Sequence, residues 1–252
     1  DRREAYGEGG IERRTQSPAG VHRDFPARCG GFGSSFPLIV AHASSHAALN
    51  GEIFALSAMR NYWFLFGCVV ELSLLFAGAM LAFLLGQPLF GNLQWCLRDF
   101  WLGILASLPL LALFFWLLHS SLPALERIGE FLEGRVRTLF EPWAIWQLAV
   151  ISLLAGVCEE VFFRSVFQGG LARHIGTIPA LVVASVIFGC FHLVTKTYAV
   201  IATLIGAYLG VLWLAAENLL APITTHAVYD FVALVYFLRA HVRQHRAARI
   251  KD

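Results

Sequence analysis

The sequence predicts an all-α fold, a polytopic transmembrane bundle of about six membrane helices with one further amphipathic helix on the membrane surface. Three observations support this class. Hydrophobic residues make up 58% of the chain and charged residues 14%, which fits a water-soluble fold poorly. The mean hydropathy is +0.65. From Tyr62 onward, long apolar runs alternate with short polar breaks, as expected for helices that cross a bilayer.

Each predicted membrane helix corresponds to one apolar run. The runs cover residues 62–85, 100–118, 143–171, 178–194, 198–216 and 219–238. The first run ends at the GQP of residues 86–88 and the second at the HSS of residues 119–121, both of which are typical helix-ending sequences. Between the second and third runs, residues 122–140 (LPALERIGEFLEGRVRTLF) place their apolar side chains near one helical face. This segment is therefore the predicted surface helix.

Composition divides the chain into three parts. Residues 1–58 are rich in Arg, Gly, Ser and His and keep no regular period, so we interpret them as a disordered or adventitious extension, with Met59 as the expected biological start. Residues 59–238 form the membrane domain, and residues 239–252 form a basic tail. By the positive-inside rule, this tail and the Arg-containing surface helix belong to the cytoplasmic side. We expect an integral protein of a bacterial inner membrane with both termini in the cytoplasm.

The totals also exclude some classes of function. The formal charge of +2 and the absence of an interleaved basic and aromatic surface argue against a nucleic-acid partner. Five cysteines occur without a CxxC pair, which predicts neither a disulfide framework nor a Cys-rich zinc site. The lipid bilayer is the expected environment of most of the chain.

Ionisable residues inside the apolar runs need a reason, because a charge near the bilayer centre costs about 2.5–3.5 kcal/mol. They occur at Glu71, at Glu159 and Glu160 with Arg164, at His192, and at His226 with Asp230. Glu160 and Arg164 are spaced for an ion pair on one helix face, whereas Glu159 is rotated by about 100° and lacks such a partner. An unpaired carboxylate in a low-dielectric pocket is a strong base. The alternative is a purely structural ion network.

The histidines extend this group of residues. His192 follows Phe188 by one helical turn, and His226 and Asp230 share one face of the last helix. Taken alone, either histidine can be a satisfied structural residue. If the three helices bring them together with the glutamates, the cluster either binds a metal or activates water.

Several known protease chemistries lack their residues in this chain. The HExxH zinc motif, the GxGD motif of intramembrane aspartyl enzymes and the GxSG nucleophile of rhomboid-like enzymes are all missing. Cys190 points about 200° away from His192 around a helix. A thiol nucleophile is therefore not expected.

Three motifs remain, in order along the chain: EEVFFR (159–164), FGCFH (188–192) and HAVYD (226–230). Together they resemble the EExxxR, FxxxH and HxxxN/D motifs of the CAAX protease and bacteriocin-processing (CPBP) family, which includes the type II CAAX prenyl endopeptidases. The similarity extends over about residues 59–237. The resemblance implies an intramembrane endopeptidase that hydrolyses a peptide or protein substrate near the membrane.

The resemblance also implies residue roles. Glu159 would take a proton from the attacking water and His192 would hold that water. His226 and Asp230 would stabilise the oxyanion, while Glu160 and Arg164 brace the site. Phe188 is a further supporting residue of the second motif.

Two positions depart from the family pattern. Ser165 stands where the family often has Gly. Asp230 replaces the Asn of the prenyl endopeptidases, and an ionised carboxylate cannot donate to an oxyanion. A metal-dependent mechanism, with Zn²⁺ held by Glu159, His192, His226 and Asp230, therefore stays open beside the glutamate-dependent one. Two other functions stay open, namely a non-catalytic membrane binding or immunity module and an ion or proton conduit.

Overall fold

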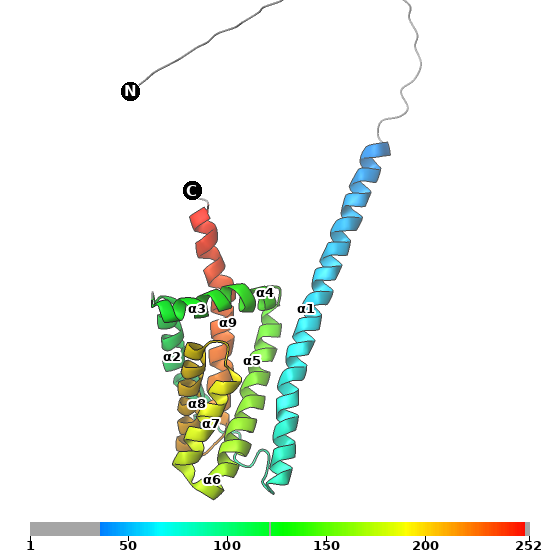
Figure 1. Ribbon diagram of the computed structural model, residues 1–252. Helices are drawn as coiled ribbons and strands as arrows, with labels where there is room; N and C mark the ends of the chain where they lie inside the picture. The colour runs from blue at the N-terminus through cyan, green and yellow to red at the C-terminus, as the bar shows by residue number, and fades with distance from the viewer. Residues whose placement is uncertain (1–35, 121, 250–252) are drawn as a thin grey trace, which may run out of the picture. The chain divides into compact units, whose positions relative to one another are not determined.

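A computed structural model of the protein describes residues 36–120 and 122–249, and the side chains of residues 57–239 apart from 121, 124 and 126. This part of the chain consists of helices joined by turns and loops and contains no strand (Figure 1). The chain divides into two units, Asp1–Ala48 and Leu49–Asp252. Of the first unit only the beginning of a helix at Phe36 is described, and every contact given below lies within the second.

The helices follow one another with few residues between them. Their bounds are α1 Phe36–Leu84, α2 Leu97–Leu118, α3 Pro123–Phe131, η1 Leu132–Val136, α4 Arg137–Phe140, α5 Ile145–Glu160, η2 Val161–Gln168, α6 Gly169–Ile175, α7 Thr177–Phe191, α8 Lys196–Ala216 and α9 Leu220–Arg249. The two elements named η are π-helical. The fold class predicted from the sequence, a polytopic all-helical bundle, is confirmed.

Five segments are long and apolar enough to cross a membrane. They are Ser57–Leu84, Leu97–Leu118, Ile145–Ile175, Lys196–Ala216 and Leu220–Arg239. The sixth predicted membrane helix corresponds to α7, which is apolar but has only 15 residues. Its apolar run continues to Val194, but the helix ends at Phe191, and Thr195 begins the next helix by accepting a hydrogen bond from Tyr198 N at 3.1 Å.

The N-terminal expectation is only partly covered by the structure. Helix α1 begins at Phe36, so the part of the extension from Phe36 to Ala58 is helical, where the sequence pattern had suggested no regular structure. Residues 1–35 lie outside the described residues. The expectation that Met59 is the biological start stays untested.

The predicted surface helix is formed by three consecutive elements. α3, η1 and α4 cover residues 123–140 and lie across one end of the bundle, whereas α6 lies at the opposite end (Figure 1). Arg137 pairs with Glu133 and, at 3.8 Å, with Glu141 along this segment. The side chain of Arg239 then donates to the backbone oxygen of Trp143 at 2.7 Å. These bonds connect the surface segment with the end of the last membrane span.

The bundle is built around α9, which packs against both α2 and α5, while α7 packs against α8. A core cluster of Trp143, Leu148, Ile151, Phe237 and Leu238 lies between α5 and α9. The start of α9 is fixed by Asn218. Its amide nitrogen donates to Asp99 Oδ2 at 2.8 Å, and its amide oxygen accepts from Leu220 N at 3.1 Å.

Helices α5 and α9 approach each other closely at Gly156. A Cβ atom at this position would lie 2.9 Å from Ile223 O and 2.9 Å from the Cβ of Ala227. Both of these atoms belong to α9 rather than to the flexible end of a side chain. Small residues at such crossings let membrane helices pack backbone to backbone.

The variant Gly156→Ala is expected to lower the free energy of unfolding by about 1–3 kcal/mol, because the added methyl group forces α5 and α9 apart. Thermal unfolding of the purified protein in detergent measures the effect. Gly129→Ala in α3 is the matched control, since a Cβ there meets nothing within 4 Å. Equal unfolding temperatures for the two variants would contradict the close crossing.

Candidate functional site

A cavity of about 520 Å³ lies between α2, the surface segment, α8 and α9. Most of its walls are apolar. Its polar lining consists of Ser120 and Glu133 at the surface segment and of Glu159, His192, Tyr198, His226, Tyr229 and Asp230. The sequence-predicted residues Glu159, His192, His226 and Asp230 thus share one cavity, together with Phe188. They come from the end of α5, from the end of α7 and the residue that follows it, and from the first half of α9.

Glu160 and Arg164 form a buried ion pair behind the cavity wall and do not line it. Glu160 Oε2 lies 3.0 Å from Arg164 Nε, and the two side chains are 0% and 1% exposed. Arg164 also donates to Gly206 O at 3.1 Å and lies 4.8 Å from the centre of the Phe188 ring. A buried pair is stable only with such additional partners. The pair therefore connects η2 with α7 and α8.

Glu159, unlike Glu160, lines the cavity and has no ion-pair partner in the described part of the chain. Its Oε2 is buried without a hydrogen-bond partner among the described residues. A buried carboxylate oxygen without a partner is rare in native proteins and points to a function or to an ordered water.

Adjacent residues of an α-helix point about 100° apart, so Glu159 and Glu160 face different surroundings. Glu160 is the last residue of α5, and the π-helix η2 follows directly at Val161 and contains Arg164. A π-helix bonds each residue to the fifth one along, so it widens the turn and shifts the faces that follow. Insertions of this kind are frequent at functional sites. The sequence pattern predicted a regular α-helix here, so this π-helical element is a correction to that expectation.

His192 stands at the end of α7 with a defined tautomer. Its Nδ1 lies 2.9 Å from Phe188 O, and because a carbonyl oxygen only accepts, Nδ1 carries the hydrogen. In a neutral ring Nε2 then keeps its lone pair. The ring stacks on Phe188 with the centroids 4.5 Å apart and the planes at 24°. His192 can therefore accept a hydrogen bond from a molecule in the cavity.

His226 lies between two carboxylates. Its Nδ1 is 2.9 Å from Glu160 Oε1, and its Nε2 is 3.5 Å from Asp230 Oδ2. The His226 side chain is 8% exposed and that of Asp230 30%. Glu160 therefore has two partners, Arg164 and His226, and fixes the orientation of the imidazole on the cavity wall.

Three polar residues near the site were not assigned a role from the sequence. Tyr198 and Tyr229 line the cavity, and Tyr229 directly precedes Asp230 in the third motif. Glu71 of α1 is close enough for its charge to act on Glu159 and His226. Glu71 was visible as an intramembrane carboxylate. The sequence did not mark the two tyrosines as site residues, because aromatic residues are common in apolar membrane segments.

The arrangement does not match a preformed zinc site. No three His, Cys, Asp or Glu side chains are placed to hold a metal ion in the described part of the chain. Zinc needs ligand atoms with free lone pairs. Both ring nitrogens of His226 face carboxylates instead, and Nδ1 of His192 is bonded to Phe188 O.

Comparison with known proteins identifies one family. Residues 141–232 match the family model described as type II CAAX prenyl endopeptidase Rce1-like. All three motifs lie within the matched residues, so the resemblance to the CPBP family is confirmed over this range. No curated protein and no solved structure matches the chain. The match and the five apolar helices support an integral membrane protein with a function of the intramembrane CAAX-protease type in general.

Proposed function

We propose that the protein is an intramembrane endopeptidase in which Glu159 activates a water molecule for attack on a peptide bond. The observation that carries this proposal is the buried, unpartnered carboxylate of Glu159 in the cavity that His192, His226 and Asp230 also line. A general base must lie within reach of the water that it deprotonates. A carboxylate without an internal partner is available for that water.

In the proposed reaction, Glu159 and His192 both contact the attacking water. Glu159 takes one proton from water while Nε2 of His192 accepts a hydrogen bond from the other. The water oxygen bonds to the carbonyl carbon, which gives a tetrahedral oxyanion. When this species collapses, the C–N bond breaks and the leaving amine takes the proton from Glu159. The products are a carboxylic acid, which then gives its proton to water, and an amine, and Glu159 is ionised again.

His226, protonated on both ring nitrogens between its two carboxylate neighbours, supplies the Nε2–H that stabilises the oxyanion. Glu160 holds the ring through Nδ1 at 2.9 Å, so Nε2 can point at the developing charge without reorganisation. Asp230 is 3.5 Å from the same nitrogen and, as a carboxylate, only accepts. Asp230 therefore positions His226 and leaves direct stabilisation of the oxyanion to the histidine.

The substrate is a peptide or protein at the membrane. The cavity walls beyond the polar cluster are apolar and include Leu125, Ile128 and Leu132 of the surface segment and Ile201 and Ile205 of α8. Such walls suit an apolar or lipidated part of the substrate next to the scissile bond. The polar cluster around Glu159 sets the position of hydrolysis along these walls.

The proposal is tested with the purified protein in detergent and a peptide library that includes lipidated C-terminal sequences. We expect cleavage by the unaltered protein, and a decrease of about 100-fold in kcat for His192→Ala, because the water loses its second contact. His174→Ala in α6 is the matched control, since His174 is exposed and outside the cavity. A folded protein that cleaves no peptide would favour the binding-module alternative.

Removal of divalent metal is expected to leave peptide hydrolysis unchanged, because the proposed reaction uses only side-chain groups. The cleavage rate is measured before and after exhaustive treatment with a chelator, with the chelator then removed by gel filtration. A loss of activity that Zn²⁺ restores would contradict the glutamate-only mechanism. In that case the four cavity residues would have to rearrange to bind the ion.

A further inference from the structure

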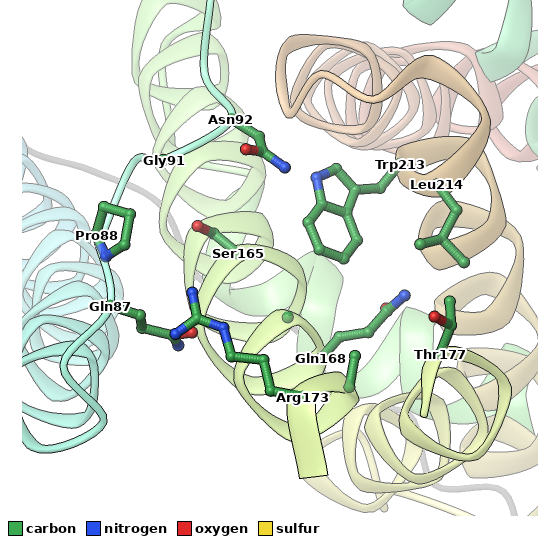
Figure 2. A pocket seen from close by; sticks show the side chains of 12 residues that line it. Gln87, Pro88, Gly91, Asn92, Ser165, Gln168, Arg173, Thr177, Trp213 and Leu214 are labelled. Carbon is green, nitrogen blue, oxygen red and sulfur yellow. The ribbon is translucent and has the colours of Figure 1, made fainter. Parts of the chain in front are cut away.

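A second cavity, of about 220 Å³, lies away from the proposed active site. It is formed by the connection after α1, by η2 and α6, by the start of α7 and by the last turns of α8 (Figure 2). Its polar lining includes Gln87, Asn92, Gln168, Arg173, Thr177 and Trp213. Since α6 lies at the end of the bundle opposite the surface segment (Figure 1), this cavity belongs to the other membrane face.

Two buried donors at this cavity have no acceptor. Gln168 is 1% exposed and Trp213 is 7% exposed, yet neither Gln168 Nε2 nor Trp213 Nε1 has a hydrogen-bond partner among the described residues. Figure 2 shows both side chains among the groups that surround the hollow. Leaving such a donor unpaired costs about 1–3 kcal/mol. An acceptor that occupies the cavity would remove this cost.

The charge of the lining indicates what kind of acceptor it takes. Arg173 is exposed at the cavity and forms no ion pair in the described part of the chain, and no Asp or Glu lines the cavity. Other polar groups are already engaged: Gln87 donates to Val166 O at 2.6 Å and Ser165 to Leu89 O at 2.8 Å. Asn92 and Thr177 add an amide and a hydroxyl that can also donate. The available groups therefore include several donors and one positive charge, with no carboxylate among them. They match an anion that presents only acceptors.

The surroundings of the cavity are apolar and exposed. Phe83 is 81% exposed and Leu84 74%, directly before the loop that supplies Gln87, and Phe90 within that loop is 44% exposed. In a membrane protein such side chains face lipid. The cavity thus lies where acyl chains border a charged headgroup region.

We propose that this cavity binds a phosphate group, carried by a phospholipid headgroup or free in solution. A phosphate group carries several acceptor oxygens around one phosphorus atom. It can therefore accept hydrogen bonds from the guanidinium of Arg173, the indole N–H of Trp213 and the amide of Gln168 at the same time. The exposed apolar flank favours the lipid-borne form. The inference does not rest on the proposed peptidase activity, since none of these residues lines the first cavity.

The test uses the delipidated full chain in detergent and native mass spectrometry with three probes. Short-chain phosphatidylglycerol carries the phosphate, diacylglycerol with the same chains lacks it, and inorganic phosphate lacks the chains. We expect one bound phosphatidylglycerol and no specific diacylglycerol. Binding should weaken about tenfold in Arg173→Gln and in Trp213→Phe, which removes the indole N–H but keeps a ring. Arg135→Gln, an exposed arginine of the surface segment, should bind like the unaltered protein.

The probes separate the two sources of phosphate. Binding of phosphatidylglycerol alone, sensitive to Arg173→Gln, identifies a lipid headgroup. Binding of inorganic phosphate with the same sensitivity identifies a site for the free anion. Equal binding of diacylglycerol and phosphatidylglycerol, or no loss in Arg173→Gln, would overturn the proposal. Because Arg173 is exposed, this variant keeps the test decisive even if Trp213→Phe is unstable.

Discussion

Glu159→Gln is expected to reduce peptide hydrolysis by roughly a thousandfold or more, the range that loss of a general base produces. Glutamine keeps the size and the hydrogen-bonding oxygen of glutamate but cannot take a proton from water. Because Glu159 has no ion pair or hydrogen bond in the described part of the chain, the substitution removes no internal contact. The loss should therefore fall on kcat, with KM and the unfolding midpoint nearly unchanged.

Two further glutamates make this prediction specific. Glu217→Gln changes an exposed side chain at the end of α8 and should leave both rate and stability unchanged. Glu160→Gln weakens the pairs with Arg164 and His226, so it should lower the unfolding midpoint as well as the rate. If Glu159→Gln retained more than a tenth of the activity, another group would have to be the base.

The membrane spans were readable from the sequence because the bilayer imposes a length and a composition on each span. The second and fifth predicted runs agree with α2 and α8 to within a few residues. The exception is α7, where apolar side chains continue after the helix has ended at Phe191. Hydropathy records burial in lipid or protein and does not record where the hydrogen bonding of a helix stops.

The polar cluster was readable for the same reason, since charges in apolar runs are costly and thus informative. Their partners were only half predictable. The i and i+4 spacing gave the pair of Glu160 and Arg164, whereas the bond from Glu160 to His226 joins residues of different helices. Helix-to-helix register depends on packing at positions such as Gly156, which no single-helix pattern contains. The π-helix was missed because its sequence, VFFRSVFQ, has neither Gly nor Pro to mark it.

The second cavity could not be predicted from the sequence at all. Gln168 and Trp213 are ordinary residues in their own segments, and they become informative only because the fold buries both beside Arg173. An unpartnered buried donor is a property of three-dimensional packing. Sequence patterns therefore predicted which charged side chains lie in apolar segments. The structure was needed to find which buried donors lack an acceptor.

His226→Phe is expected to lower kcat by roughly 100- to 1,000-fold, the usual effect of removing one donor to an oxyanion. Phenylalanine keeps a ring on the cavity wall but has no N–H. The substitution also leaves Glu160 Oε1 without its 2.9 Å partner, so a lower unfolding midpoint is expected together with the loss of rate. His174→Phe, at an exposed position of α6, is the matched control for the size of the new side chain.

The neighbouring carboxylate decides how a loss at His226 is interpreted. If Asp230 acts only by accepting from His226 Nε2, an asparagine oxygen can replace it, and Asp230→Asn should keep activity within about tenfold. If hydrolysis in His226→Phe fell no further than in Asp230→Asn, the histidine would not be the oxyanion donor. Both rates must be compared at temperatures well below the unfolding midpoints. Under those conditions a large loss in His226→Phe with a small loss in Asp230→Asn assigns the donor to the imidazole, because only that ring is held in place by the buried Glu160.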